Sequence, residues 1–342
     1  MHSPATNFAS HERTIRNLIT KAYDQCKRLI EYAASAPEVP IYRLTDGQYV
    51  EVARLRRGAF RAVIPVGLTV ETFTPFSAMC KEMPEIAPIL GRYSFISMSV
   101  DDLFVLNRFL PTTGELLHYL EVRQAAAGIP RAFIFDEIEH LGSYITKNRF
   151  DMDWAEQLKT VDRLAWDSFG EIVDRHFEAD RWLNEAVPRQ SFPDGLNPIL
   201  AALDKLRPRG WLAFDAYIRN LGDDGRNDLV KFLGELLPTL SQFPARRILY
   251  GNDQPLQIWL CRAGSEPPPK KVLYQGQVAS LYASGTSVKV LTLSYSPQGE
   301  IVAVGCEVVG PPTILQMNYL ELLAEVEKQK ERVLFTKDTP EK

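Results

Sequence analysis

The sequence predicts an α+β fold with mixed sheets, arranged in two main units that meet near residues 190–205. Residues 12–34 repeat apolar side chains at helical spacing, which predicts a long amphipathic helix near the start of the chain. Short apolar runs bounded by turn residues, such as residues 132–135 (AFIF), predict strands that alternate with helices. The Pro-Asp-Gly sequence at 193–195 predicts a loop at the boundary between the units.

The N-terminal elements follow from spacing and turn chemistry. The first helix has an apolar stripe made of Ile15, Leu18, Ile19, Ala22, Cys26, Leu29 and Ile30. Asp46 and Gly47 are typical of a tight turn, so residues 41–55 are predicted to form a β-hairpin. Residues 61–70 (RAVIPVGLTV) predict a core strand, with a bulge or an edge position at Pro65.

The next segment is less regular. Residues 73–83 are expected to form a helix or to pack irregularly, and residues 94–98 are a candidate strand. Ser99, followed by Asp101 and Asp102, predicts the start of a helix over residues 103–110, because a serine cap and acidic residues favour a helix N-terminus.

The central stretch, residues 115–144, combines a helix, a strand and an acidic turn. Thr112 and Glu115 have the spacing of a capping box, so a helix is predicted to begin there and to end before Gly128 and Pro130. The apolar run at 132–135 predicts a buried strand. The acidic sequence that follows the strand, Asp136-Glu137-Ile138-Glu139-His140, is open to two interpretations, which are weighed below.

The C-terminal half predicts a small sheet with flanking helices. Helices are expected within residues 151–180, at 197–206, about 226–237 and about 315–332, with paired strands at 247–250 and 256–262 and a hairpin at 288–295 and 300–309. Residues 211–217 (WLAFDAY) alternate like a strand or lead into a helix. Pro267-Pro268-Pro269 predicts a linker.

Composition limits the class of protein. The chain has 342 residues, of which 45% are hydrophobic, so a sizeable core is expected. The net charge of −4 implies no broad basic surface, although local basic patches are compatible with it. The sequence has no apolar run long enough for a transmembrane helix and no apolar signal core, so we expect a cytoplasmic protein without a membrane partner. Four scattered cysteines predict reduced thiols.

Searches for catalytic and nucleotide-binding motifs find none. The sequence contains no GxxxxGK[ST] loop, no GxGxxG, no HExxH and no GxSxG. Metal-dependent nucleases of the restriction type use a (D/E)xK pair, in which carboxylates hold Mg²⁺ and the lysine helps to polarise the reacting groups. No lysine of this chain has Asp or Glu two residues before it. As the sequence stands, it predicts no nuclease activity of this kind and no evident cofactor.

The acidic cluster has a metal interpretation and a structural one. Asp136, Glu137, Glu139 and His140 are candidate ligands, because Asp136, Glu139 and His140 would share one helix face and could hold a divalent cation such as Mg²⁺. The structural interpretation is favoured: Asp136 would cap the next helix and Glu139 would complete a capping box. A metal-dependent hydrolase is therefore the weakest of three functional hypotheses.

The chain resembles the part of bacterial nuclease-related, restriction-endonuclease-like proteins that follows their catalytic motif. The matching segments include HERTIRNLITKAYDQCKRLIEYA, FRAVIPVGLTVE, SVDDLFVLNRFL, FDEIEHLGSYI and VLTLSYSPQGEIVAVGCEV. The resemblance implies a partial nuclease-like unit lacking its catalytic half at residues 1–110, a helical middle segment at 111–195 and a C-terminal mixed α/β domain at 196–342. It supplies no catalytic residue, and it makes Gln25 and Lys27 auxiliary site candidates.

Two hypotheses stand ahead of the hydrolase. In the first, the chain is an accessory, non-catalytic portion of a nuclease-related protein that associates with DNA, in defence against foreign DNA. The candidate contacts are Arg13, Arg16, Lys21, Gln25, Lys27, Arg54, Arg56, Arg57 and Arg61. In the second, the chain is a protein-interaction module, whose partner could supply the missing strands. Exposed charge on a helix face is common, so the basic helix by itself does not decide between them.

Overall fold

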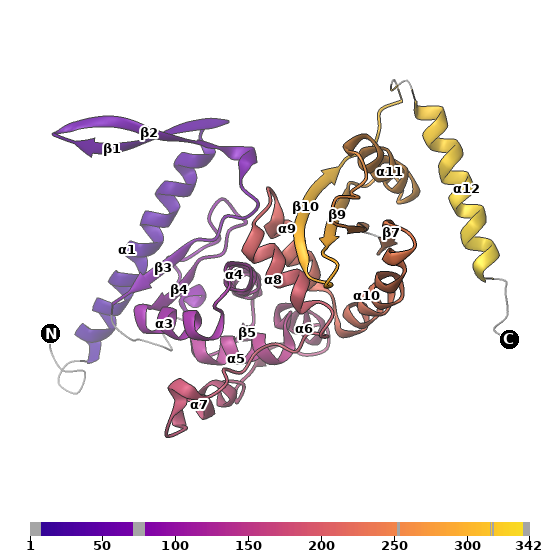
Figure 1. The fold of residues 1–342 in the computed structure, drawn as a ribbon. Helices are drawn as coiled ribbons and strands as arrows, with labels where there is room; N and C mark the ends of the chain where they lie inside the picture. The colour runs from indigo at the N-terminus through magenta and orange to yellow at the C-terminus, as the bar shows by residue number, and fades with distance from the viewer. Residues whose placement is uncertain (1–7, 71–78, 252–253, 315, 317, 338–342) are drawn as a thin grey trace. The chain divides into compact units, whose positions relative to one another are not determined.

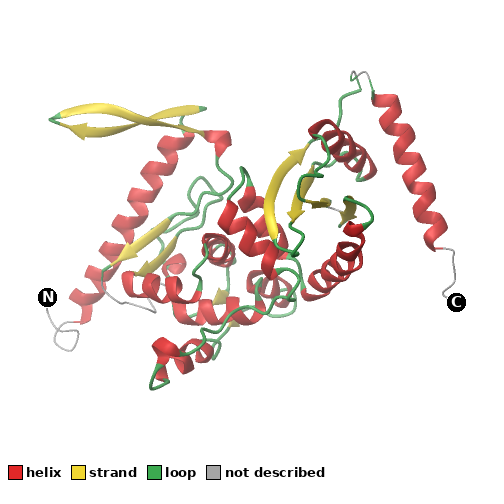
Figure 2. Cartoon of the chain, viewed as in Figure 1, coloured by secondary structure: helices red, strands yellow, loops and turns green. Residues whose placement is uncertain are grey.

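The structure is a computed structural model that describes residues 8–70, 79–251, 254–314, 316 and 318–337. Helices and short sheets alternate along the chain, so the fold is mixed α+β, as the sequence predicts (Figures 1 and 2). The chain divides into two units, residues 1–191 and 192–342. None of the helices described combines the length and the apolar character that a bilayer crossing requires.

Unit 1 contains several small sheets rather than one large one. Its helices are α1 (Phe8–Ala34), α3 (Val100–Phe109), α4 (Thr113–Ala127), α5 (Glu137–Lys147), α6 (Phe150–Gln157) and α7 (Glu171–Glu178). Its strands are β1 (Glu38–Thr45), β2 (Gln48–Arg56), β3 (Val66–Thr69), β4 (Ile96–Ser99), β5 (Ala132–Phe133) and β6 (Leu164–Ala165). β1 and β2 pair antiparallel, whereas β3 pairs with β4, and β5 with β6, in parallel.

Helix α1 is held by the apolar stripe that the sequence predicts. Ile15, Ile19 and Ile30 are buried against Phe95 and neighbouring apolar residues of unit 1. The helix also packs on β3, where the chain comes close enough to require glycine. A Cβ atom at Gly67 would lie 2.5 Å from the Phe95 ring. One face of α1 is thereby fixed, and the other is left to solvent.

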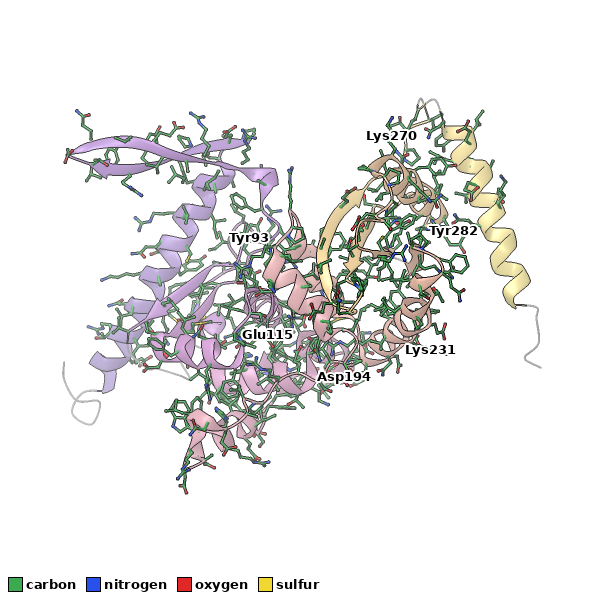
Figure 3. All side chains as sticks on the ribbon, in the orientation of Figure 1. Tyr93, Glu115, Asp194, Lys231, Lys270 and Tyr282 are labelled. Atoms are coloured by element: carbon green, nitrogen blue, oxygen red, sulfur yellow. The ribbon has the colours of Figure 1, made fainter. Side chains whose placement is uncertain are left out.

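The β1–β2 hairpin forms as predicted around Asp46 and Gly47, which have φ angles of 52° and 76°. Both positive values suit the tight hairpin turn that an Asp-Gly pair favours. The outer half of the hairpin is exposed on both faces, and its side chains extend to either side of the ribbon (Figure 3). Tyr49 is 77% exposed, so the tip of the hairpin adds little to the core of unit 1.

The core strand predicted over residues 61–70 is shorter than expected. β3 begins at Val66, directly after Pro65, whose carbonyl accepts a hydrogen bond from the Ile96 amide. Because Pro65 has no N–H group to donate, the hydrogen bonds that β3 donates to a neighbouring strand cannot extend back through it. The predicted strand 94–98 is β4. The segment predicted as helix or irregular at 73–83 lies partly outside the described residues, and a short 3₁₀ helix occupies Cys80–Glu82.

The helices of the central stretch begin at the predicted caps. Ser99 and Asp102 form a reciprocal capping box at the start of α3. Thr112 accepts a hydrogen bond from the Glu115 amide at the start of α4, and Asp136 accepts one from the Glu139 amide at the start of α5. These helices enclose a core that runs from β4 to α7 and therefore includes residues on both sides of position 110.

Unit 2 is a four-stranded sheet with helices, in agreement with the prediction. Its helices are α8 (Asn197–Leu206), α9 (Trp211–Asn220), α10 (Asp223–Leu236), α11 (Pro269–Tyr282) and α12 (Tyr319–Lys337). The strand order is β10 (Ile301–Val309), β9 (Val288–Tyr295), β8 (Leu256–Arg262) and β7 (Ala245–Tyr250). β8 and β9 are parallel, and the outer pairs are antiparallel.

Two elements of unit 2 differ from the sequence expectation. Residues 211–217 are helical, so the strand alternative is wrong; Trp211 and Phe214 face the same core because they are one helical turn apart. The proline run does not act only as a linker, because α11 begins at Pro269. A proline in the first helical turn sacrifices no hydrogen bond, so the run marks a helix start as readily as a break.

Candidate nucleic-acid interface

The exposed face of α1 carries much of the predicted basic surface. Arg13, Lys21, Gln25 and Lys27 are exposed and lie outside the buried isoleucine stripe. Lys21, Gln25 and Lys27 belong to the lining of a surface hollow of about 540 Å³, which also includes Asp24, Arg28 and Glu31. The lining therefore mixes both signs of charge, with an excess of basic groups.

Part of the predicted basic set is neutralised within unit 1. Four arginines form ion pairs with glutamates. With the nitrogen-to-oxygen distances where given, the pairs are Arg16 with Glu12 (3.0 Å), Arg54 with Glu51 (2.7 Å), Arg56 with Glu38 (3.6 Å) and Arg61 with Glu121. A guanidinium that already has a carboxylate partner must give up that contact to bind a phosphate. These four arginines are therefore weaker candidates for nucleic-acid contacts than the sequence alone suggests.

The remaining basic candidates have no such partner. Within the described ranges, no carboxylate forms an ion pair with Arg13, Lys21, Lys27 or Arg57. Arg57 differs from the other three because it lies at the end of β2 and lines a pocket of about 520 Å³. The structure thus divides the predicted set into neutralised arginines and basic groups that are free to meet an anion.

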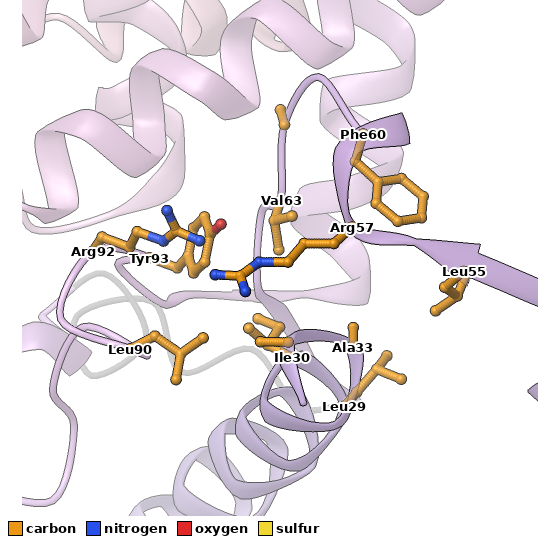
Figure 4. A pocket seen from close by; sticks show the side chains of 12 residues that line it. Leu29, Ile30, Ala33, Leu55, Arg57, Phe60, Val63, Leu90, Arg92 and Tyr93 are labelled. Atoms are coloured by element: carbon orange, nitrogen blue, oxygen red, sulfur yellow. The ribbon is translucent and has the colours of Figure 1, made fainter. Parts of the chain in front are cut away.

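The pocket lies where the end of α1, the end of β2 and the loop before β4 come together (Figure 4). Its walls are mainly apolar and include Leu29, Ile30, Ala33, Phe60, Val63 and Leu90. Its charged groups are Arg57 and Arg92, and the Arg92 guanidinium lies 4.5 Å from the centre of the Tyr93 ring. Sequence reasoning missed Arg92 and Tyr93, because they lie in a loop without periodicity or motif.

The acidic cluster of the metal hypothesis is distributed over separate contacts. Asp136 caps α5, whereas the Glu139 carboxylate accepts a hydrogen bond from the Phe169 amide at 2.8 Å and so does not close the predicted capping box. His140 is buried among rings, with the Phe150 ring centre 5.8 Å away. Among the described residues, no group of three or more His, Cys, Asp or Glu side chains is arranged to hold a metal ion.

Glu137 belongs to a buried ion pair. Its carboxylate lies 3.1 Å from Nε of Arg123 and accepts a hydrogen bond from the Tyr119 hydroxyl. The side chains of Arg123 and Glu137 are 2% and 4% exposed. Burial raises the pKa of the Glu137 carboxyl, and Arg123 opposes that change by favouring the charged form. The contacts of Glu137 therefore link α5 to α4.

Two further titratable groups lie near this core. Burial raises the pKa of the Cys80 thiol to about 11, so the thiol is protonated at neutral pH and is a poor nucleophile. Burial also lowers the pKa of Lys81 to about 8. The Lys81 ammonium donates hydrogen bonds to the carbonyls of Ile129, which follows α4, and of Ala132, which begins β5. These contacts hold the loop around Cys80 against the central core.

Comparison of the chain with protein-family models, with curated proteins and with solved structures found no match. The resemblance to nuclease-related proteins therefore stays a prediction, carried by the sequence segments alone.

Proposed function

We propose that this chain is a non-catalytic accessory module that binds nucleic acid through unit 1. The observation that carries the proposal is the set of exposed basic side chains without a carboxylate partner among the described residues: Arg13, Lys21, Lys27 and Arg57. Phosphate groups are the natural partners of such side chains, and neutralising them releases counterions from the nucleic acid. The overall charge of −4 limits the expected interface to local groups of this kind.

The test is the salt dependence of binding to labelled double-stranded DNA, single-stranded DNA and RNA, followed by fluorescence anisotropy. With about four phosphate contacts, the logarithm of the affinity should fall with the logarithm of salt concentration at a slope of roughly −3 to −4. Lys21→Gln and Lys27→Gln should each weaken binding to all sequences equally and reduce the slope by about 1.

Arg16→Gln and Arg54→Gln provide matched controls. Each removes the same positive charge, but from a side chain that is already paired with Glu12 or Glu51. They should change the slope less than the lysine variants do. If the wild-type chain binds no nucleic acid at low salt, or if the control variants weaken binding as much as the lysine variants, the proposal is wrong.

The β3–β4 pair supports a second candidate function, binding a protein partner. In the described part of the chain these strands pair only with one another, and a parallel sheet usually has more than two strands. Leu68 on β3 is 48% exposed and the adjoining Val70 is 87% exposed. A partner that adds strands would cover this apolar surface. Leu68→Lys should then abolish capture of a stoichiometric protein partner without changing the salt-dependent binding of DNA.

A further inference from the structure

The pocket of unit 1 holds two arginines that face each other. Arg57 reaches in from the end of β2 and Arg92 from the loop before β4, and their guanidinium groups point toward one another across the pocket (Figure 4). Within the described residues, neither arginine forms an ion pair with a carboxylate. Like charges that face one another repel, and an anion bound between them would remove that repulsion.

The rest of the pocket is suited to a flat apolar group. The side chains of Leu29, Phe60 and Leu90 at the pocket are 57%, 48% and 46% exposed, although aliphatic and aromatic groups usually gain from burial. Phe60 offers an aromatic ring, whereas one face of the Tyr93 ring already meets the Arg92 guanidinium. The volume of about 520 Å³ is within the usual range of small-molecule sites. The complementary ligand therefore joins a planar ring system to an anionic group.

The charge of the two arginines identifies the kind of anion. A guanidinium pair carries two positive charges and offers several N–H donors in a fixed planar geometry that matches phosphate oxygens. A terminal phosphate monoester carries about −1.5 to −2 charges at neutral pH, whereas an internal phosphodiester carries one. Two facing guanidinium groups are thus better matched by a terminal phosphate than by the backbone of a continuous strand.

We propose that this pocket binds a nucleoside phosphate, with the phosphate between Arg57 and Arg92 and the base on the apolar wall beside Tyr93. The ligand has two possible sources, a free mononucleotide and the phosphorylated end of a strand. Its identity as a nucleotide rests on the proposed nucleic-acid function. The pocket adds specificity for a chain end, which the basic face of α1 does not provide.

The test compares single-stranded oligonucleotides of one sequence that carry a 5′-phosphate, a 3′-phosphate or only hydroxyl ends, with free nucleoside monophosphates as a separate arm measured by calorimetry. The wild-type chain should bind one phosphorylated end about tenfold or more tightly than the hydroxyl strand, because hydrogen bonds to charged groups are lost without the phosphate. Arg57→Gln and Arg92→Gln should each abolish this preference. Tight binding of the free monophosphates, with the same dependence on both arginines, would support the pocket and identify a free nucleotide as the ligand.

Arg56→Gln is the matched control, because Arg56 adjoins Arg57 but pairs with Glu38 and does not line the pocket. It should keep the preference for the phosphorylated end. Equal binding of phosphorylated and hydroxyl strands, with no binding of monophosphates, would overturn the pocket proposal and leave salt-dependent nucleic-acid binding intact. Absence of strand binding at low salt would instead overturn the proposed function. If monophosphates then also fail to bind, both proposals fall.

Discussion

The ion pair between Arg123 and Glu137 provides the sharpest test of the core of unit 1. Replacing Arg123 by methionine keeps an unbranched apolar side chain but leaves the Glu137 carboxylate buried with Tyr119 as its remaining hydrogen-bond donor. Removing one partner of a buried pair costs about 3–5 kcal/mol. Arg123→Met should therefore lower the free energy of unfolding of unit 1 by that amount at neutral pH.

The double variant Arg123→Met/Glu137→Leu separates the interaction energy of the ion pair from the cost of burying one unpaired charge. Neither charge then has to be buried, so the double variant should be less destabilised than the sum of the single variants, by roughly 1–3 kcal/mol. Urea unfolding measures the total change. Amide hydrogen exchange, measured for α4 and α5 in the intact chain, assigns this change in stability to unit 1, since those helices carry the two side chains.

The pH dependence adds a second constraint on the same pair. Burial raises the pKa of Glu137, and loss of Arg123 removes the charge that opposes this shift. In Arg123→Met the carboxyl should take up a proton more readily, so the cost of the substitution should shrink as pH falls toward the raised pKa. A cost below about 1 kcal/mol at neutral pH, or a strictly additive double variant, would show that Arg123 and Glu137 do not depend on each other in the core.

Four further substitutions, three in unit 1 and Gly234→Ala in α10 of unit 2, test particular positions. Gly142→Ala should lower the free energy of unfolding in urea by several kcal/mol, because the new Cβ would lie 1.9 Å from the Phe169 carbonyl oxygen. Gly234→Ala has open space around it and should stabilise its helix by about 1 kcal/mol. Asp136→Ala should lower stability by about 1 kcal/mol through loss of a cap, without altering metal binding by calorimetry. Between pH 8 and 10.5 the unfolded chain holds the Lys81 proton more tightly, so wild-type stability should rise with pH relative to Lys81→Met.

The features that the sequence predicts well are local ones. The hairpin follows from two adjacent turn residues, Asp46 and Gly47, and the starts of α3 and α5 follow from Ser99 and Asp136 within four residues of each helix. Such signals depend on backbone groups a few positions away, so no knowledge of the tertiary fold is needed to interpret them. Acidic residues that cap a helix occupy the same local positions as candidate metal ligands, so the sequence pattern alone does not separate the two.

The features that the sequence does not predict depend on long-range contacts. Arg61 has no acidic neighbour in the sequence, yet it pairs with Glu121 sixty positions away. Arg57 and Arg92 line one pocket although β3 lies between them along the chain. A single sequence contains no record of such proximity, which arises only when α1, β2 and the loop before β4 pack together. The basic residues could be identified in advance, but not which of them remain unpaired.

Neighbouring arginines at the end of β2 differ in their partners. Arg54 and Arg56 each have a glutamate within reach, so the hairpin largely neutralises its own charge. Arg57 follows them directly, yet it lies beside an apolar pocket and faces a second arginine. Exposed ion pairs contribute little to stability, so the fold does not depend on the pairs of Arg54 and Arg56. In the proposed complex, an anion between Arg57 and Arg92 would balance their positive charge, as Glu51 and Glu38 do for Arg54 and Arg56.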